Sequence, residues 1–167
     1  METATRPYAF SRKVFCEGMR DGVPIALGYF AVSFSLGIAA RSAGLTPIQG
    51  FIASLFNNAS AGEYAAFSLI AAGATYVEVA IITLIANARY LLMSCALAQR
   101  FAPGTPFFHR LIIGYDVTDE LFGITIARPG CLNPFYTYGA ITLAAPAWAM
   151  GTALGIVAGN LLPLRAV

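Results

Sequence analysis

The charged residues of this chain gather at a few points and leave long apolar runs between them. Runs without any charged residue cover residues 22–40 (19 residues), 42–62 (21 residues) and 129–164 (36 residues). An α-helix needs about 20 mostly apolar residues to cross the hydrocarbon core of a bilayer. The pattern therefore predicts an all-α fold, a multi-pass transmembrane helix bundle with about five membrane segments, one of them broken or re-entrant.

Turn signals separate the predicted helices. Thr46 and Pro47 are typical of an N-cap and a first helical residue, and Pro24 fits the first turn of a helix. We expect continuous helices at residues 23–40, 75–98, 111–127 and 136–160, and an interrupted apolar stretch at residues 48–73.

The last of these helices carries a stripe of small residues. Gly151, Gly155 and Gly159 are spaced by four, so they lie along one side of the helix. Small residues on one face let two membrane helices approach closely. We interpret this stripe as a packing surface rather than a catalytic one.

The distribution of basic residues gives an orientation. Residues 1–21 contain Arg6, Arg12, Lys13 and Arg20, which predicts a cytoplasmic N-terminal segment followed by one transmembrane domain at residues 22–163. Two topologies stay open. If residues 48–73 cross fully, the loop at residues 100–110 lies outside. If they fold back, that loop and Arg165 lie inside, which fits the charge bias better.

Composition narrows the function classes. Charged residues make up 11% of the chain and hydrophobic residues 58%, whereas a soluble domain is usually about 25% charged. The net charge of +2 does not indicate a nucleic-acid partner. Three scattered cysteines and the single histidine, His109, give no disulfide framework, no metal-ligand spacing and no Ser-His triad. We expect no cofactor, no metal and no enzyme activity.

Charged groups inside the predicted membrane region carry the functional signal, because they are costly there unless they face a polar interior. Glu78 and Arg89 are eleven residues apart, so on one helix they would share a face but not touch. Arg89 then needs another acceptor, either Glu63 or a carboxylate of residues 111–127. A structural ion pair and a site for a substrate carboxylate are the two interpretations.

Three further acids are crowded together. Asp116, Asp119 and Glu120 have i, i+3, i+4 spacing and would line one side of a helix at residues 111–127. Like charges this close favour proton uptake by one of them, which suits proton coupling, with Glu78 as a further candidate. The alternative is a polar helix end in water.

The interrupted stretch contains Asn57, Asn58, Ser60 and Glu63. A broken helix exposes N–H groups that attract carboxylates, so the break is a candidate substrate site. A local alternative is a capping box, with Ser60 as the N-cap and Glu63 three residues later.

Four segments resemble the AzlC family of branched-chain amino acid exporters, in the same order as in that family. The resemblance spans about residues 18–163 and rests on these segments: SAGEYAA (60–66), NARYLLMS (87–94), TDELF (118–122) and WAMGTALG (148–155).

The resemblance implies an exporter of branched-chain or similar small amino acids in the bacterial inner membrane, with a small AzlD-type membrane subunit as partner. The combined candidate substrate-binding residues are Asn57, Asn58, Ser60, Glu63, Asn87 and Arg89.

Two departures from the family pattern stand out. The family has a glutamine at the position of Glu63, and its members continue through about two more helices. We expect that the chain is truncated or that a partner supplies those helices.

Two other functions compete with transport. One is a non-transporting structural subunit of a membrane complex. The other is an intramembrane aspartyl protease, which Asp116 beside Tyr115 would suit, but the chain has no Gly-x-Gly-Asp segment to provide a second aspartate.

Overall fold

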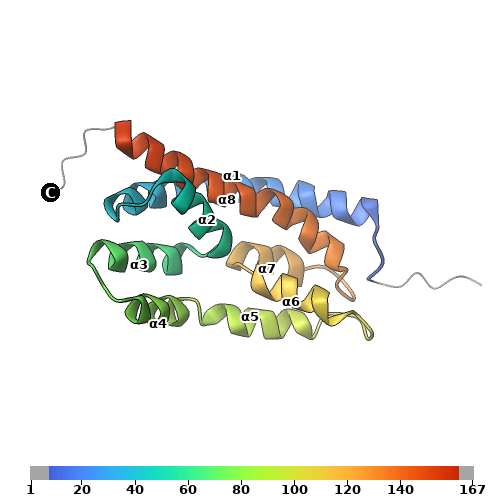
Figure 1. Cartoon of the computed structure of the whole chain (residues 1–167). Coiled ribbons are helices and arrows are strands. Elements are labelled where there is room, and N and C mark those ends of the chain that lie inside the picture. The colour runs from blue at the N-terminus through green and yellow to red at the C-terminus, as the bar shows by residue number, and fades with distance from the viewer. Residues whose placement is uncertain (1–7, 162–167) are drawn as a thin grey trace, which may run out of the picture. The chain divides into compact units, whose positions relative to one another are not determined.

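The computed structural model describes residues 8–161, and the regular secondary structure in this range is helical (Figure 1). The all-α prediction is confirmed. Arg6, Pro163 and Arg165 lie outside the described residues. The helices are α1 (Arg12–Ser42), α2 (Pro47–Phe56), α3 (Ser60–Ala71), α4 (Tyr76–Ala86), α5 (Arg89–Ala98), α6 (Phe107–Tyr115), α7 (Asp119–Ile126) and α8 (Pro134–Leu161).

Two of these helices, α1 with 31 residues and α8 with 28, are long and apolar enough to span a bilayer. The consecutive helices α4 and α5 give a third candidate if they count as one bent span. The helices α2, α3, α6 and α7 have 8 to 12 residues, which is too short for a crossing. The segments predicted at residues 48–73 and 111–127 are therefore each built from two short helices.

Several predicted boundaries are wrong for identifiable reasons. Helix α1 begins at Arg12 instead of residue 23, because residues 12–21 include good helix formers, and Pro24 lies inside it rather than in the first turn. The helices predicted at 75–98 and 111–127 are interrupted at residues 87–88 and 116–118. Thr118 is the N-cap of α7, where its side chain accepts from the N–H of Leu121. Such a cap competes with helix continuation.

The chain divides into two compact units, each described here by itself. The first comprises residues 8–25 and 89–144, and the second comprises residues 26–88 and 145–161. Helices α1 and α8 contribute their first parts to the first unit and their remaining parts to the second.

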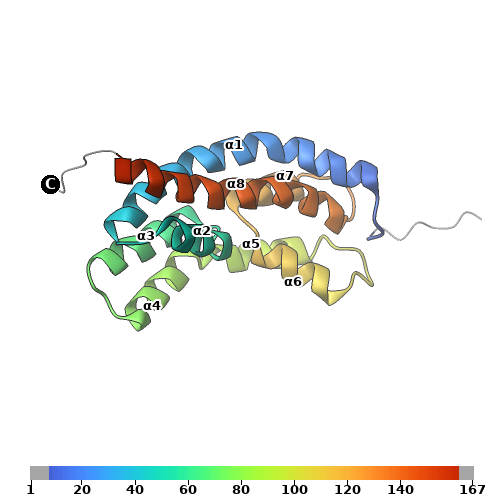
Figure 2. The ribbon, with the colours of Figure 1, turned by 45° about the horizontal axis from the view of Figure 1, so that its top comes forward.

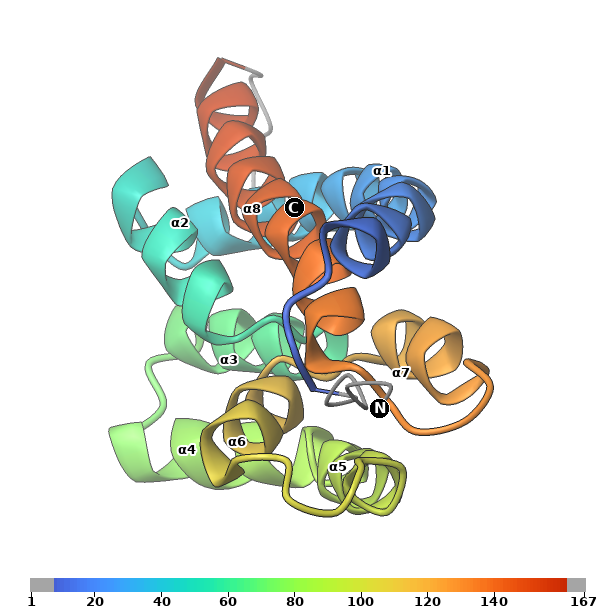
Figure 3. The ribbon, with the colours of Figure 1, turned by 90° about the vertical axis from the view of Figure 1, so that its right-hand side faces the viewer.

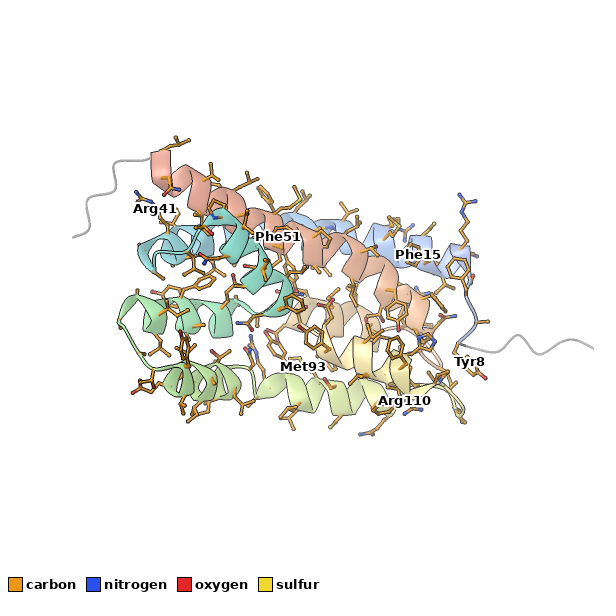
Figure 4. The ribbon with its side chains drawn as sticks, in the orientation of Figure 1. Tyr8, Phe15, Arg41, Phe51, Met93 and Arg110 are labelled. Atoms are coloured by element: carbon orange, nitrogen blue, oxygen red, sulfur yellow. The ribbon has the colours of Figure 1, made fainter. Side chains whose placement is uncertain are left out.

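In the first unit, α6 and α7 both contact α5 (Figure 3). Met93 of α5 packs against the core of this unit (Figure 4). Arg100 donates to the carbonyls of Ile126, Arg128 and Gly130, so it fastens the end of α7 and the following loop. The buried residues of this core are Leu97, Phe101, Ile113, Val117 and Leu132.

In the second unit, α3 and α4 lie side by side (Figure 1). Thr46 caps α2 as predicted, in a capping box with Gln49, and Pro47 is the first helical residue. Thr75 and Glu78 form a second capping box at the start of α4. These caps supply partners for N–H groups that a helix start leaves unsatisfied.

The predicted glycine stripe packs against α1 (Figure 2). In the second unit, the backbone of Gly151 lies against Phe30, and that of Gly155 lies against Phe34 and Gly37. In the first unit, Gly18 lies against Tyr136 in the same way. In each unit, residues later in α1 contact residues later in α8, so the two helices run parallel.

We expect Gly155→Ala to lower the free energy of unfolding by about 1–3 kcal/mol, because the added Cβ would collide with the carbonyl oxygen of Phe34. Gly28→Ala in α1 is the matched control, since a Cβ there meets nothing within 4 Å. Denaturation of the purified proteins by sodium dodecyl sulfate measures both. Equal stability of the two variants would contradict close packing at Gly155.

Candidate functional site

A buried carboxylate joins three helices of the second unit. Glu63 in the first turn of α3 is 1% exposed. Its side chain accepts from the hydroxyl of Ser54 in α2, from Trp148 Nε1 in α8 at 2.6 Å and from Thr152 Oγ1 at 3.3 Å. Burial of a carboxylate is tolerated when hydrogen bonds replace its water, and these three donors do so.

The capping-box interpretation of Glu63 is wrong. The N-cap of α3 is Ala59, which has no side chain that can cap, and Ser60 is the exposed first residue of the helix. The side chain of Glu63 faces α2 and α8 instead. None of the ion pairs in the described part of the chain involves Glu63, so its partners are neutral donors.

Two helix breaks meet in the second unit. Asn57 ends α2 and Asn87 ends α4, and Asn87 Nδ2 donates to Asn57 Oδ1 at 3.1 Å. The amide of Asn87 also rests on Gly62, where any Cβ would collide with it. Asn58, the next residue of the first break, is half-buried. A hydrogen bond between residues 30 positions apart thus links the two breaks.

A pocket of about 860 Å³ opens beside this amide pair. Its walls come from α2, α3 and α4, and its polar lining residues are Asn57, Thr83 and Asn87 together with the tyrosine at position 76. The rest of its lining is apolar: Ala53, Phe56, Ala66, Ile70, Gly73, Ala74, Val79, Ala80 and Leu84. An apolar pocket with a few convergent polar groups is the usual form of a small-molecule site.

In the first unit, Arg89 finds its acceptor on α7. Arg89 Nη2 lies 2.9 Å from Asp119 Oδ2, and it also donates to the hydroxyl of Tyr90 at 3.3 Å. The prediction that a carboxylate of residues 111–127 pairs with Arg89 is confirmed, and the alternative partner, Glu63, is excluded by the contacts above. Both side chains of the pair are nearly half exposed.

The predicted stripe of three acids does not exist. Asp116 is buried at the C-cap of α6, whereas Asp119 and Glu120 lie exposed in the first turn of α7. The break at residues 116–118 separates them. Acidic residues in a first turn are favoured by the helix dipole, which gives Asp119 and Glu120 a local role as well.

Glu78 also differs from its predicted role. It is exposed, and its carboxylate accepts from the backbone N–H and the hydroxyl of Thr75, both at 2.8 Å. The break at residues 87–88 interrupts the helix face that it was expected to share with Arg89. Its geometry is that of a helix cap.

Among the residues that the structure describes, no group of three or more His, Cys, Asp or Glu side chains could hold a metal ion.

Comparison with known proteins identifies the family. The family model described as AzlC protein matches residues 24–162 of this chain. The chain belongs to the AzlC family. This match confirms the resemblance of the four sequence segments. The chain contains helices long and apolar enough to span a bilayer, and the relatives described next are membrane proteins, so it is a membrane protein.

Two relatives place the chain among membrane proteins of this family. It is 28% identical over 151 residues to an uncharacterized membrane protein of Archaeoglobus fulgidus, covering 90% of this chain and 65% of the relative. It is 24% identical over 164 residues to the inner membrane protein YgaZ of Escherichia coli K12, covering 96% of this chain and 67% of YgaZ. The chain thus spans about two thirds of the length of these relatives. No solved structure matches it.

Replacement of Glu63 separates a structural role from a role that needs charge. We expect Glu63→Gln to fold as well as the wild type, because an amide can accept from Trp148 and donate to the two hydroxyls. We expect Glu63→Ala to lose about 2–4 kcal/mol of unfolding free energy, since it leaves buried donors unpaired and opens a cavity.

Detergent-solubilised protein and thermal unfolding measure this difference. Glu78→Gln is the control, because it makes the same change at an exposed cap that accepts glutamine equally well. A stable Glu63→Ala variant would show that the buried hydrogen bonds do not hold the helices together.

Proposed function

We propose that this AzlC protein is a transporter subunit that exports branched-chain or similar small amino acids across the bacterial inner membrane. The observation that carries the proposal is the pocket beside the Asn57–Asn87 hydrogen bond. Its apolar wall suits an aliphatic side chain, and the helix breaks provide polar groups at one end. Transporters commonly bind substrates where membrane helices are interrupted.

The family resemblance supports amino acid export and a small AzlD-type membrane subunit as partner. We place the N-terminal segment in the cytoplasm, because the basic residues of the described part of that segment, Arg12, Lys13 and Arg20, follow the positive-inside rule. Asn57, Asn58 and Asn87 are the substrate-binding residues that this proposal retains. Ser60 is a further candidate at the start of α3, whereas Glu63 acts through the packing of α2, α3 and α8.

We expect proteoliposomes with the chain and its small partner to export leucine, and Asn87→Ala to raise the KM for leucine about tenfold, since one hydrogen bond of this kind is worth about a factor of ten. Asn160→Ala is the matched control, because Asn160 pairs with Arg41 at the end of α8. No leucine flux by the wild-type protein with its partner would favour the structural-subunit alternative.

Proton coupling is proposed to act through the Arg89–Asp119 pair. Proton uptake by Asp119 removes the negative charge that holds Arg89, so the pair can open and close with the proton. Release of Arg89 by this proton is the proposed coupling step. Asp116 and Glu120 are secondary candidates for the same role, and Glu78 is assigned to capping.

We expect Asp119→Asn to abolish leucine accumulation driven by a pH gradient while it spares exchange of leucine down its own gradient. Flux in proteoliposomes with an imposed pH difference measures both activities. Glu78→Gln is the control, because it neutralises an exposed carboxylate that caps α4. A full pH response in the Asp119→Asn variant would remove Asp119 from the coupling mechanism.

A further inference from the structure

Two polar atoms at one end of the pocket lack a hydrogen-bond partner. They are Thr83 Oγ1, in the last turn of α4, and Asn87 Oδ1, at its C-cap, and both atoms are buried from solvent. The residues are four positions apart, a spacing that brings side chains together on one side of a helix. Both residues line the pocket.

Turning over the side-chain amides of Asn57 and Asn87 would not give Asn87 a second hydrogen-bond partner. One hydrogen bond joins Asn87 to Asn57, from Nδ2 to Oδ1. If both amides were turned over, the same bond would form in the opposite direction and the other polar atom of Asn87 would lack a partner. In the orientation that the structure has, the atom of Asn87 without a partner is Oδ1, an acceptor, whereas the reverse orientation would leave Nδ2, a donor.

Buried polar atoms in native proteins nearly always have partners, and exceptions call for an explanation. Threonine in a helix can satisfy its hydroxyl on the carbonyl four residues earlier, as Ser94 does with Tyr90 at 2.7 Å. Thr83 makes no such bond. Its hydroxyl therefore keeps a hydrogen-bonding capacity that no group of the described chain uses.

The chemistry of this end favours a group with several hydrogen-bond donors. The two oxygens are neutral acceptors, and none of the residues that line the pocket is charged. An ammonium group has three donors and no acceptor, so it can satisfy both oxygens at once. The adjoining wall of Ile70, Val79 and Leu84 offers aliphatic contact to the rest of the same molecule.

We propose that Thr83 and Asn87 form the subsite that binds the protonated amine of the substrate, while its aliphatic side chain lies on the apolar wall. The inference rests on the proposed function and deepens it, because it makes Thr83 a specificity-determining residue. The ligands that fit are aliphatic primary amines, including zwitterionic α-amino acids.

Two leucine analogues test the amine and the carboxylate of the substrate one at a time. 3-Methylbutylamine keeps the amine and the branched side chain, and 4-methylpentanoate keeps the carboxylate and the side chain. We expect isothermal titration calorimetry on the purified protein to show binding of the amine, weakened about tenfold in Thr83→Val, which keeps the shape but removes the hydroxyl.

Two further variants are controls for misfolding. Thr83→Ser keeps the hydroxyl and should bind the amine like the wild type. Thr142→Val removes a hydroxyl that is bonded to the carbonyl of Gly139, outside the pocket, and should also leave binding unchanged.

Unchanged amine binding in Thr83→Val, absence of amine binding in the wild type, or a loss that affects only 4-methylpentanoate would each overturn the amine subsite. Leucine flux in proteoliposomes is measured separately. Normal leucine flux with a failed amine subsite would leave the proposed function standing, whereas amine binding without leucine flux would contradict the proposed function alone.

Discussion

Inside a bilayer, backbone N–H and C=O groups that leave a helix find no water, so protein groups must satisfy them. The same requirement holds for buried backbone groups at the interruptions at residues 57–59, 87–88 and 116–118. At the first break, Asn57 N–H returns to the carbonyl of Ala53, and Ala59 N–H bonds to the carbonyl of Asn57. At the third, Thr118 caps α7. The polar side chains that gather at the breaks are therefore both structural partners of the backbone and candidates for binding.

In the second unit, side-chain hydrogen bonds connect the helices around the break at residues 57–59. Glu63 accepts hydrogen bonds from side chains of α2 and α8, and the Asn57–Asn87 hydrogen bond connects the ends of α2 and α4. The pocket beside them is lined mostly by apolar residues and by a few polar ones, which is the lining that an amphipathic small molecule requires.

Local signals made part of this architecture predictable. Thr46 and Pro47 mark a helix start through backbone chemistry alone, and glycines spaced by four mark close packing whatever the partner is. The break at residues 116–118 was also predictable, but the i, i+3, i+4 spacing of the three acids favoured one continuous helix instead. A threonine followed by two acids is typical of a new helix start, and Thr118 has that role.

Long-range pairings had no such signal. Trp148 lies 85 residues from Glu63, and nothing in either neighbourhood predicts that an indole N–H meets a carboxylate. The same holds for Asn57 with Asn87 and for the free hydroxyl of Thr83, which follow from how α2, α3 and α4 pack. Sequence patterns identified Asn57, Glu63 and Asn87 but not Thr83, and packing decided which of these residues act together.

The parallel course of α1 and α8 imposes a parity rule on the chain between them. Two spanning helices that run in the same direction start on the same side of the membrane, so the intervening segment makes an odd number of crossings. With one crossing by α4 and α5, the pair α2–α3 and the pair α6–α7 must behave alike. If α4 and α5 together make one crossing, a topology in which residues 48–73 fold back while residues 111–127 cross would make α8 antiparallel to α1. With that one crossing, the two broken segments either both cross the bilayer or both fold back, and if α4 and α5 fold back instead, only one of the two broken segments crosses.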